Sequence, residues 1–214
     1  MEIKLKNKVY NPQRVFCIGR NYADHIKEMK SETPKSPVIF LKPNTCLVEK
    51  DIQIPFPSSG KDLHHEVEIV YLIGKEGKPV SLDDAKSFIS GVSLGLDLTL
   101  RDVQNILKDK GQPWELSKAF DYSAPLGDFM PVENIVIHNI AFTCIVNNEI
   151  RQQGNSSDMI FSIENLIMAI SSVWKLLEGD LIFTGTPSGV ASLMKGDRIT
   201  IQSPSIGSFS WEIL

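Results

Sequence analysis

The chain has 214 residues and a mass of 23.9 kDa, which suits one large domain or two small ones. Hydrophobic residues make up 42% and charged residues 22% of the sequence, an ordinary globular composition that excludes a disordered or low-complexity chain. The formal net charge of −4, without a basic tract, excludes a typical nucleic-acid-binding protein.

The cysteines and the apolar runs bear on the cellular compartment. Three cysteines, Cys17, Cys46 and Cys144, cannot all pair, and none lies in a CxxC motif, which argues for a reducing compartment. The first residues lack the apolar segment of a secretory signal, and no apolar run approaches the ~18 residues that span a bilayer. We therefore expect a cytoplasmic protein with neither a membrane nor a nucleic-acid partner.

Six prolines punctuate the first 60 residues and exclude long helices there, because each fixes φ and lacks a backbone donor. One short helix fits between them, over residues 22–30. Asn21 can cap its start and Asp24 follows three residues later, a variant of the capping box. Residues 38–41 then predict a buried strand that ends at Pro43.

Two further helices are predicted in the middle of the chain. Ser81 can cap the first, with Asp84 three residues on, and Gly91 can end it. Thr99 can cap the second, which we expect over residues 100–110.

The last third of the chain is rich in strand patterns. Residues 140–146 and 150–152 flank Asn147 and Asn148, which suit a tight hairpin turn because asparagine tolerates positive φ. Three more short apolar stretches predict strands over 181–183, 198–202 and 208–213.

One amphipathic helix interrupts these strands. After Ser162, apolar residues recur at i, i+3, i+4 and i+7 as far as Leu177, and Gly179 can end the helix. Helices and strands therefore do not alternate strictly, which disfavours Rossmann and TIM arrangements. The pattern favours a β-rich α+β fold.

Paired carboxylates are the most informative feature. Residues 65–73 predict a strand, and Glu66 and Glu68 project from one face of it because side chains alternate along a strand. Such a pair repels unless a cation lies between, and oxygen ligands suit Mg²⁺, Mn²⁺ or Ca²⁺ better than Zn²⁺. The apolar run over 91–97 ends in Asp97, which is placed to be a third ligand. The alternatives are an exposed edge strand for the glutamates and a turn or cap for the aspartate.

Other polar groups could complete an active site. His25 and Glu28 share a face of the first helix and can form an oriented general base, although an ordinary surface pair has the same spacing. Arg101, Gln104 and Lys118 could bind a carboxylate substrate or could equally be solvated. The turn over 184–189 offers hydroxyl and backbone N–H groups, or simply ends a strand.

In this order, these pieces resemble the fumarylacetoacetate hydrolase superfamily, and most of all its small single-domain branch of acylpyruvate hydrolases and oxaloacetate decarboxylases. The resemblance rests on seven ordered motifs, at residues 17–29, 40–43, 64–68, 96–104, 111–120, 153–162 and 179–190. It implies an α+β mixed β-roll with a few short helices, a single catalytic domain over 1–214 and a homodimer. It also implies that residues 20–35, approximately, form a mobile lid helix.

The resemblance also implies roles for individual residues. Glu66, Glu68 and Asp97 match the ligands of one Mg²⁺ or Mn²⁺ ion per chain. The catalytic positions match His25, Glu28 and Lys118. The substrate-binding positions match Arg20, Arg101, Gln104, Gly185 and Thr186.

The implied activity is metal-dependent cleavage of a C–C bond in 2,4-dioxo acids such as acetylpyruvate or fumarylpyruvate, through a metal-stabilised pyruvate enolate. Oxaloacetate decarboxylation or tautomerisation can share this enolate. Two alternatives stay open: an isomerase, decarboxylase or hydratase of aromatic ring-cleavage products of the 2-hydroxyhepta-2,4-diene-1,7-dioate type, and a non-catalytic metal-binding protein.

Overall fold

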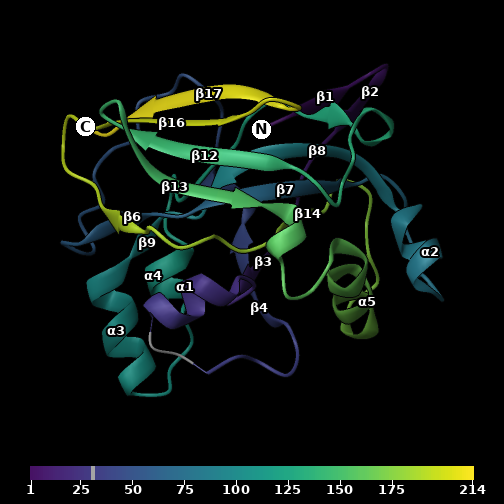
Figure 1. Ribbon diagram of the computed structural model, residues 1–214, viewed down its shortest axis with the longest axis horizontal. Coiled ribbons are helices and arrows are strands. Elements are labelled where there is room, and N and C mark those ends of the chain that lie inside the picture. Colours follow the sequence, from purple (N-terminus) through teal and green to yellow (C-terminus); the bar gives the residue numbers. More distant parts are fainter. Residues whose placement is uncertain (30–31) are drawn as a thin grey trace.

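A computed structural model describes residues 1–29 and 32–214 of the chain. At its centre is a six-stranded mixed sheet in which β14 is parallel to β3 and antiparallel to β7 (Figure 1). The strand order is β11 (Met130–Pro131), β8 (Ile89–Leu96), β7 (Val67–Ile73), β14 (Leu181–Phe183), β3 (Arg14–Gly19) and β4 (Val38–Pro43).

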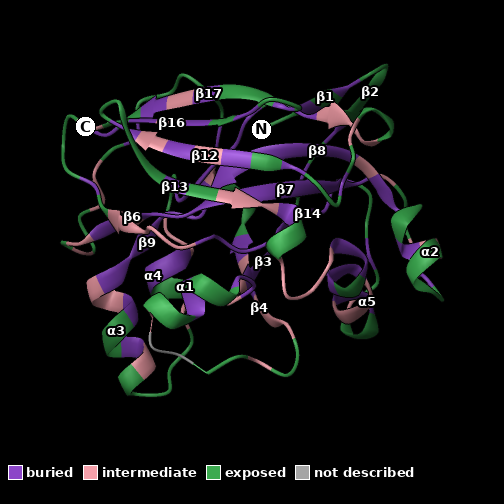
Figure 2. Cartoon of the chain, viewed as in Figure 1, coloured by how far each residue is buried: buried purple, intermediate pink, exposed green. Residues whose placement is uncertain are grey.

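A second, four-stranded antiparallel sheet lies over the first in Figure 1. Its order is β13 (Glu149–Asn155), β12 (Ala141–Val146), β16 (Arg198–Ser203) and β17 (Gly207–Glu212). Side chains from both sheets, such as Ile69, Phe142 and Trp211, belong to one buried apolar cluster. Figure 2 shows β7 and β8 of the central sheet buried along most of their length, whereas much of β13, at the edge of the second sheet, is exposed.

Three small sheets complete the strand content. They pair β1 (Ile3–Leu5) with β2 (Lys8–Tyr10), β5 (Leu47–Val48) with β10 (Ala124–Pro125), and β6 (Leu63–His65) with both β9 (Thr99–Leu100) and β15 (Ala191–Ser192). The predicted β-rich α+β class is confirmed.

The described residues include five α-helices and three 3₁₀ turns. These are α1 (Ala23–Glu28), α2 (Leu82–Lys86), α3 (Arg101–Asp109), α4 (Glu115–Lys118), α5 (Ile163–Val173), η1 (Asn44–Cys46), η2 (Val132–Asn134) and η3 (Ser156–Asp158). In Figure 1, α1, α3 and α4 gather below β6 and β9, whereas α2 and α5 lie at the other side of the molecule. The first group of helices carries much of the site described below.

One of the three predicted helix caps is confirmed and two are wrong. The hydroxyl oxygen of Ser81 accepts a backbone N–H bond at the start of α2, as predicted, and Ser162 makes the same kind of cap at the start of α5. Tyr22, not Asn21, occupies the cap position of α1. Thr99 lies in β9 and donates its hydroxyl to the carbonyl of Asp97. Long-range partners therefore outweigh the local capping preference at both wrong positions.

The ends of the helices also differ from the prediction. Helix α2 ends before Gly91, because β8 already begins at Ile89. Helix α5 ends at Val173 and not near Gly179, because Trp174 takes an extended backbone conformation and its ring packs 5.6 Å from that of Phe16. The predicted end of the first helix at residue 30 lies outside the described residues.

The predicted hairpin is confirmed. Asn147 and Asn148 have φ angles of 50° and 69° between the antiparallel strands β12 and β13. Two consecutive positive φ values are what a two-residue hairpin turn of type I′ requires.

Candidate active site around a buried acidic triad

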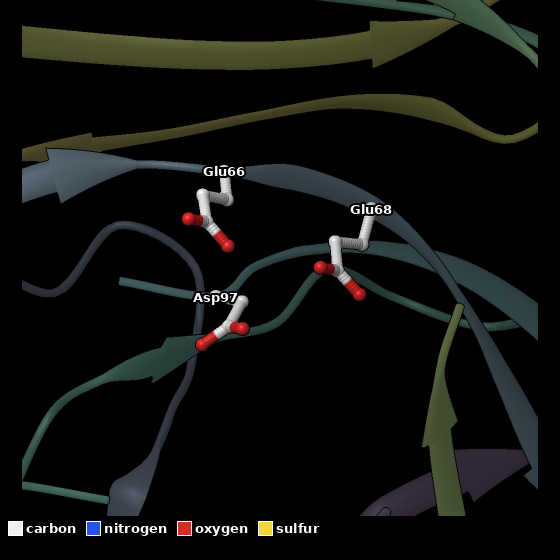
Figure 3. Close-up of side chains that lie close together, drawn as sticks. All are labelled: Glu66, Glu68 and Asp97. Carbon is white, nitrogen blue, oxygen red and sulfur yellow. The ribbon is translucent and has the colours of Figure 1, made fainter. Parts of the chain in front are cut away.

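Glu66, Glu68 and Asp97 converge in the interior (Figure 3). Glu66 lies between β6 and β7, Glu68 on β7, and Asp97 directly after β8. Because β7 and β8 are antiparallel neighbours, the backbone N–H of Asp97 donates to the carbonyl of Glu66 over 2.8 Å. One carboxylate oxygen from each residue lies within 4.8 Å of the others, and all three side chains are buried.

This triad fits a hard divalent cation. Three buried carboxylates supply oxygen donors of the type that Mg²⁺ and Mn²⁺ prefer, and they leave coordination positions for substrate and water. The backbone N–H of Gly185 donates to Oε2 of Glu68 over 2.8 Å and fixes that carboxylate. The alternative of an exposed edge strand is wrong for these glutamates, since both are buried.

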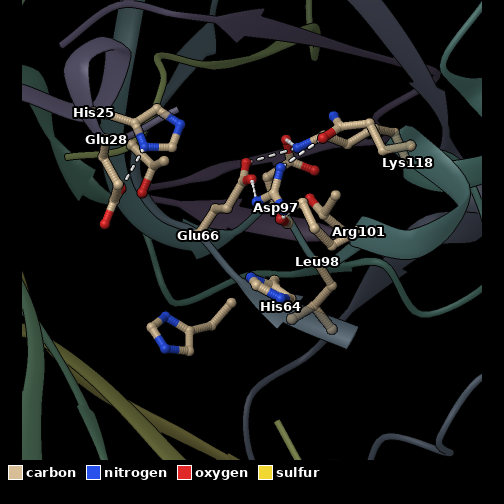
Figure 4. Close-up of polar contacts among 12 residues, drawn as sticks. His25, Glu28, His64, Glu66, Asp97, Leu98, Arg101 and Lys118 are labelled. Carbon is tan, nitrogen blue, oxygen red and sulfur yellow. Dashed lines mark hydrogen bonds and ion pairs between the residues drawn. The ribbon is translucent and has the colours of Figure 1, made fainter. Parts of the chain in front are cut away.

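Three cationic side chains pair with the triad, and Figure 4 shows two of them, Arg101 and Lys118, beside Glu66 and Asp97. Nζ of Lys118, on α4, lies 2.7 Å from Oε2 of Glu66 and 2.6 Å from Oδ2 of Asp97. Arg101, at the start of α3, donates to the other oxygen of Glu66. Neither side chain is solvated, because both are buried.

Lys42 on β4 is the third of these cations, and it is not among the site residues predicted from the sequence. Its Nζ lies 2.8 Å from Oδ1 of Asp97, and the side chain is 1% exposed. The ammonium also donates to the carbonyls of Lys118 and Ser123, so it holds the end of α4 beside the triad. The available signal is a lysine within an apolar strand pattern, just before Pro43.

Burial and charge act in opposite directions on these groups. Burial alone would raise the pKa of Glu66, but the positive charges of Lys118 and Arg101 lower it. Burial, followed by repulsion from Asp97 and Glu66, raises the pKa of Glu68 well above its ordinary value. Burial would lower the pKa of Lys118, but attraction to Asp97 and Glu66 raises it overall. Glu68 is therefore the carboxylate least compensated by the protein's own cations.

The histidine–glutamate pair lies beside the triad. Nδ1 of His25 is 3.1 Å from Oε2 of Glu28 on α1; the imidazole is buried, at 7% exposed, whereas Glu28 is exposed. The other oxygen of Glu28 accepts the backbone N–H of Gly189 over 3.0 Å. This bond ties α1 to the turn that follows β14.

The side chain of Asn21 forms long-range hydrogen bonds and does not cap α1 as predicted. Its amide donates to the carbonyls of Phe161 and Thr184, and its Oδ1 accepts the N–H of Phe161. The residue before α1 is thereby fixed to the end of β14 and to the segment before α5.

Four of the five predicted substrate-binding residues, Arg20, Arg101, Gln104 and Thr186, line one cavity. Oε1 of Gln104 accepts from Nη1 of Arg101 on the same face of α3. The hydroxyl of Thr186 donates to the carbonyl of Val67 over 2.8 Å, so its proton is committed to the protein. The cavity also contains the acidic triad and is lined by residues that include Arg20, His25, Glu66, Glu68, Asp97, Arg101, Gln104, Lys118 and Thr186. Gly185 contributes through its bond to Glu68 and does not line the cavity itself.

Gln152 on β13 is a second residue that the sequence analysis misses. Its Oε1 accepts from the N–H of Val67 over 3.1 Å and lies 2.8 Å from Nδ1 of His65. Its Nε2 donates to Thr186 Oγ1 and to the carbonyl of Pro187. Polar residues are common along this strand, and nothing in the sequence separates this buried one from its exposed neighbours.

Residues 14–213 match the family model for the C-terminal part of fumarylacetoacetate (FAA) hydrolase. A mitochondrial oxaloacetate tautomerase of Bos taurus is 44% identical over 188 residues, which are 87% of this chain and 85% of that protein. An oxaloacetate tautomerase of Escherichia coli K12 is 44% identical over 194 residues, or 90% and 89% of the two chains.

Among solved structures, the chain is similar to fumarylpyruvate hydrolase from Pseudomonas aeruginosa in complex with Mn²⁺ and pyruvate. The TM-score is 0.95 at 32% identity, covering 100% of this chain and 95% of the other. The chain therefore belongs to the fumarylacetoacetate hydrolase family of enzymes and has the fold of its C-terminal domain. Among residues 1–29 and 32–214, each helix is too short or too polar to cross a bilayer.

Proposed function

We propose that the chain is a divalent-metal-dependent enzyme of short 2-oxo acids whose principal reaction is the keto–enol tautomerisation of oxaloacetate. The observation that carries this proposal is the buried triad, with its lysines and arginine, at the base of a cavity that also holds His25. The similar oxaloacetate tautomerases from two distant organisms support this choice of reaction.

Each group of residues in the site has its own role in the proposed reaction. A Mg²⁺ or Mn²⁺ ion held by Glu66, Glu68 and Asp97 would stabilise negative charge that develops on the 2-oxo oxygen. Glu28 engages Nδ1 of His25 and leaves Nε2 to remove a proton from C3 of the keto acid, while the 2-oxo oxygen takes up a proton from solvent to give the enol. In the reverse direction the enol oxygen releases its proton and Nε2 returns a proton to C3. Lys118 and Gln104 donate hydrogen bonds to the substrate, while Arg101 holds Glu66 in place.

A second reaction is favoured by the orientation of the His25–Glu28 pair. An imidazole fixed by a carboxylate can also activate water, which would attack C4 of a 2,4-dioxo acid. The C3–C4 bond then breaks, the acyl group leaves as a carboxylic acid, and the pyruvate enolate takes up a proton. The likeness to fumarylpyruvate hydrolase supports this C–C hydrolysis as a second activity.

One experiment tests both reactions. The ultraviolet absorbance of enol-oxaloacetate is followed with Mg²⁺, with Mn²⁺ and with a chelator, and acetylpyruvate is followed in parallel by NMR. We expect metal-dependent acceleration of enol decay, and metal-dependent acetate and pyruvate from the second substrate if hydrolysis also occurs. Enol decay at the uncatalysed rate would overturn the tautomerase proposal. Inertness of both substrates would make isomerisation of ring-cleavage products the leading alternative.

Four further expectations stay predictions: a single domain over 1–214, a lid over residues 20–35, a homodimer and a cytoplasmic location. Limited proteolysis with and without a 2-oxo acid tests the first two. Light scattering measures the oligomeric state, and fractionation of cells measures the location.

A further inference from the structure

Two cations line the cavity without the carboxylate partners that the other cations have. Lys108 lies near the end of α3, with Nζ 5.5 Å from the centroid of the Trp114 ring, and Arg20 directly follows β3. Within the described residues, 1–29 and 32–214, neither forms an ion pair with a carboxylate, whereas Arg101 and Lys118 both pair with Glu66.

Lys108 faces the same cavity as the predicted substrate contacts. Arg101, Gln104 and Lys108 follow an i, i+3, i+7 pattern and so share one face of α3. Two turns of helix separate the first and last, about 10 Å along the axis. Long side chains on a helix extend back toward its N-terminus, which brings the ammonium nearer to Gln104 and the triad.

The positive charge at Lys108 is poorly compensated. Burial, together with repulsion from Arg101, Lys118 and Arg20, lowers its pKa to about 8, and attraction to Glu66 offsets only part of this. An anion placed beside the ammonium would restore the charged form. The environment is therefore that of an anion site in which the anion is supplied from outside the chain.

The backbone at Arg20 gives an independent indication. Its φ is 61°, in the left-handed region that residues with a Cβ rarely adopt. Strained residues of this kind gather at ligand sites, where the strain serves to aim a side chain. Arg20 lies between β3 and the segment that leads into α1, at the wall of the cavity.

We propose that Lys108 and Arg20 form an anion subsite that binds the second carboxylate of a dicarboxylic 2-oxo acid. This inference rests on the proposed function, since it assumes that the 2-oxo acid end lies at the triad. It narrows the substrates to dicarboxylates with a short chain between the two acid groups, and it makes Lys108 a determinant of specificity that has no part in proton transfer.

The test compares oxaloacetate with its 4-ethyl monoester, which keeps the 2-oxo acid end and lacks the second charge. The variants are Lys108→Gln, Lys108→Arg, and Lys110→Gln as a control that removes the same charge from the exposed C-cap position of α3. In Lys108→Gln we expect KM for oxaloacetate to rise about tenfold, while kcat stays within twofold of the wild-type value. KM for the monoester should change far less. Lys108→Arg should recover most of the preference for oxaloacetate over the monoester. Lys110→Gln should have the KM values of the wild type for both substrates.

Three other results would overturn the inference. Equal losses on the two substrates in Lys108→Gln would indicate a structural role for the lysine. An active wild-type enzyme that does not prefer the dicarboxylate would contradict the subsite and leave the proposed function standing. A wild-type enzyme inactive on both compounds would remove the proposed function and the subsite together. If Lys108→Gln folds poorly, Arg20→Gln with the same substrate pair decides the matter.

Discussion

Gln152 and Thr186 are joined by a 2.7 Å hydrogen bond between Nε2 and Oγ1, although they belong to different layers of the molecule. Gln152 lies on the four-stranded sheet, and Thr186 follows β14 of the central sheet. The same glutamine accepts the N–H of Val67, the residue between the two glutamates of the triad. One amide side chain therefore fixes the position of the cavity wall relative to the carboxylates.

Replacing Gln152 with leucine should lower both the stability of the protein and its rate of turnover. The substitution leaves the N–H of Val67 without its buried partner, which costs about 1–3 kcal/mol, and it removes the bond to Thr186 Oγ1, whose hydroxyl keeps only its bond to the carbonyl of Val67. Urea unfolding measures the loss. Gln153→Leu, at the exposed neighbouring position, is the control, and equal stability of the two variants would contradict the positioning role.

Isosteric substitutions should distinguish the effects of Glu66 and Glu68 on the stability of the metal-free protein. Glu66→Gln removes the partner of buried Lys118 and Arg101 and should cost about 3 kcal/mol in the presence of chelator. Glu68→Gln relieves repulsion from Asp97 and Glu66, so we expect a metal-free protein at least as stable as the wild type. Both variants should lose the gain in stability that Mn²⁺ confers on the wild type. A Mn²⁺-induced shift in melting temperature retained by either would speak against that residue as a ligand.

Lys42→Met should lower the free energy of unfolding far more than the loss of a surface lysine does. Removing the ammonium leaves Asp97 with an unpaired buried oxygen, for which we expect about 3 kcal/mol of lost stability. Lys50→Met breaks the exposed pair with Asp128 and should cost less than about 1 kcal/mol. Denaturant unfolding at one pH compares the two, and similar losses would mean that Lys42 is not needed to balance the triad.

His25→Asn should lower kcat for tautomerisation by about 10²–10⁴ if the imidazole moves the proton. Mn²⁺ binding, followed by electron paramagnetic resonance, should stay at the wild-type level because the triad is untouched. Lys27→Asn, on the exposed side of the same helix, controls for helix damage. Near-normal turnover by His25→Asn would assign proton transfer to another group.

The subsite at Lys108 should respond to pH. Burial and the neighbouring positive charges of Arg101, Lys118 and Arg20 lower its pKa to about 8, while Glu66 acts in the opposite direction. The ammonium is lost as pH rises through that value, so KM for oxaloacetate should rise above about pH 8. In Lys108→Gln, KM for oxaloacetate should not change over the same pH range. A rise in KM above about pH 8 that persists in this variant would come from the titration of a different group.

The acidic triad could be predicted because its signals are local. Alternation along 65–73 places Glu66 and Glu68 on one face, and Asp97 stands out as an acid that ends an apolar run. The strand-rich class and the Asn147–Asn148 hairpin follow from the same kind of short-range pattern. The individual signals need no knowledge of which strands become neighbours, whereas the meeting of Asp97 with the glutamates depends on the pairing of β7 with β8.

Other features depend on neighbours that are distant in the sequence. Lys42 meets Asp97 across 55 positions, and Gln152 meets Thr186 across 34. Asn21 looks like a helix cap, but its amide is used by Phe161 and Thr184, 140 and 163 positions away. A pattern within one segment cannot reveal such partners, because the preference of the isolated segment is outweighed by contacts made only in the folded chain.

The bond from Gly189 to Glu28 has a consequence for observing the helix that carries His25. The bond leaves the backbone N–H of Gly189 protected while α1 rests on the turn, and a Cβ at Gly189 would lie 2.1 Å from the carbonyl oxygen of Arg151, so the turn tolerates no bulkier residue. Opening of the lid predicted over residues 20–35 would break this bond and expose the amide to solvent. Deuterium uptake at Gly189 would then report how often the cavity opens.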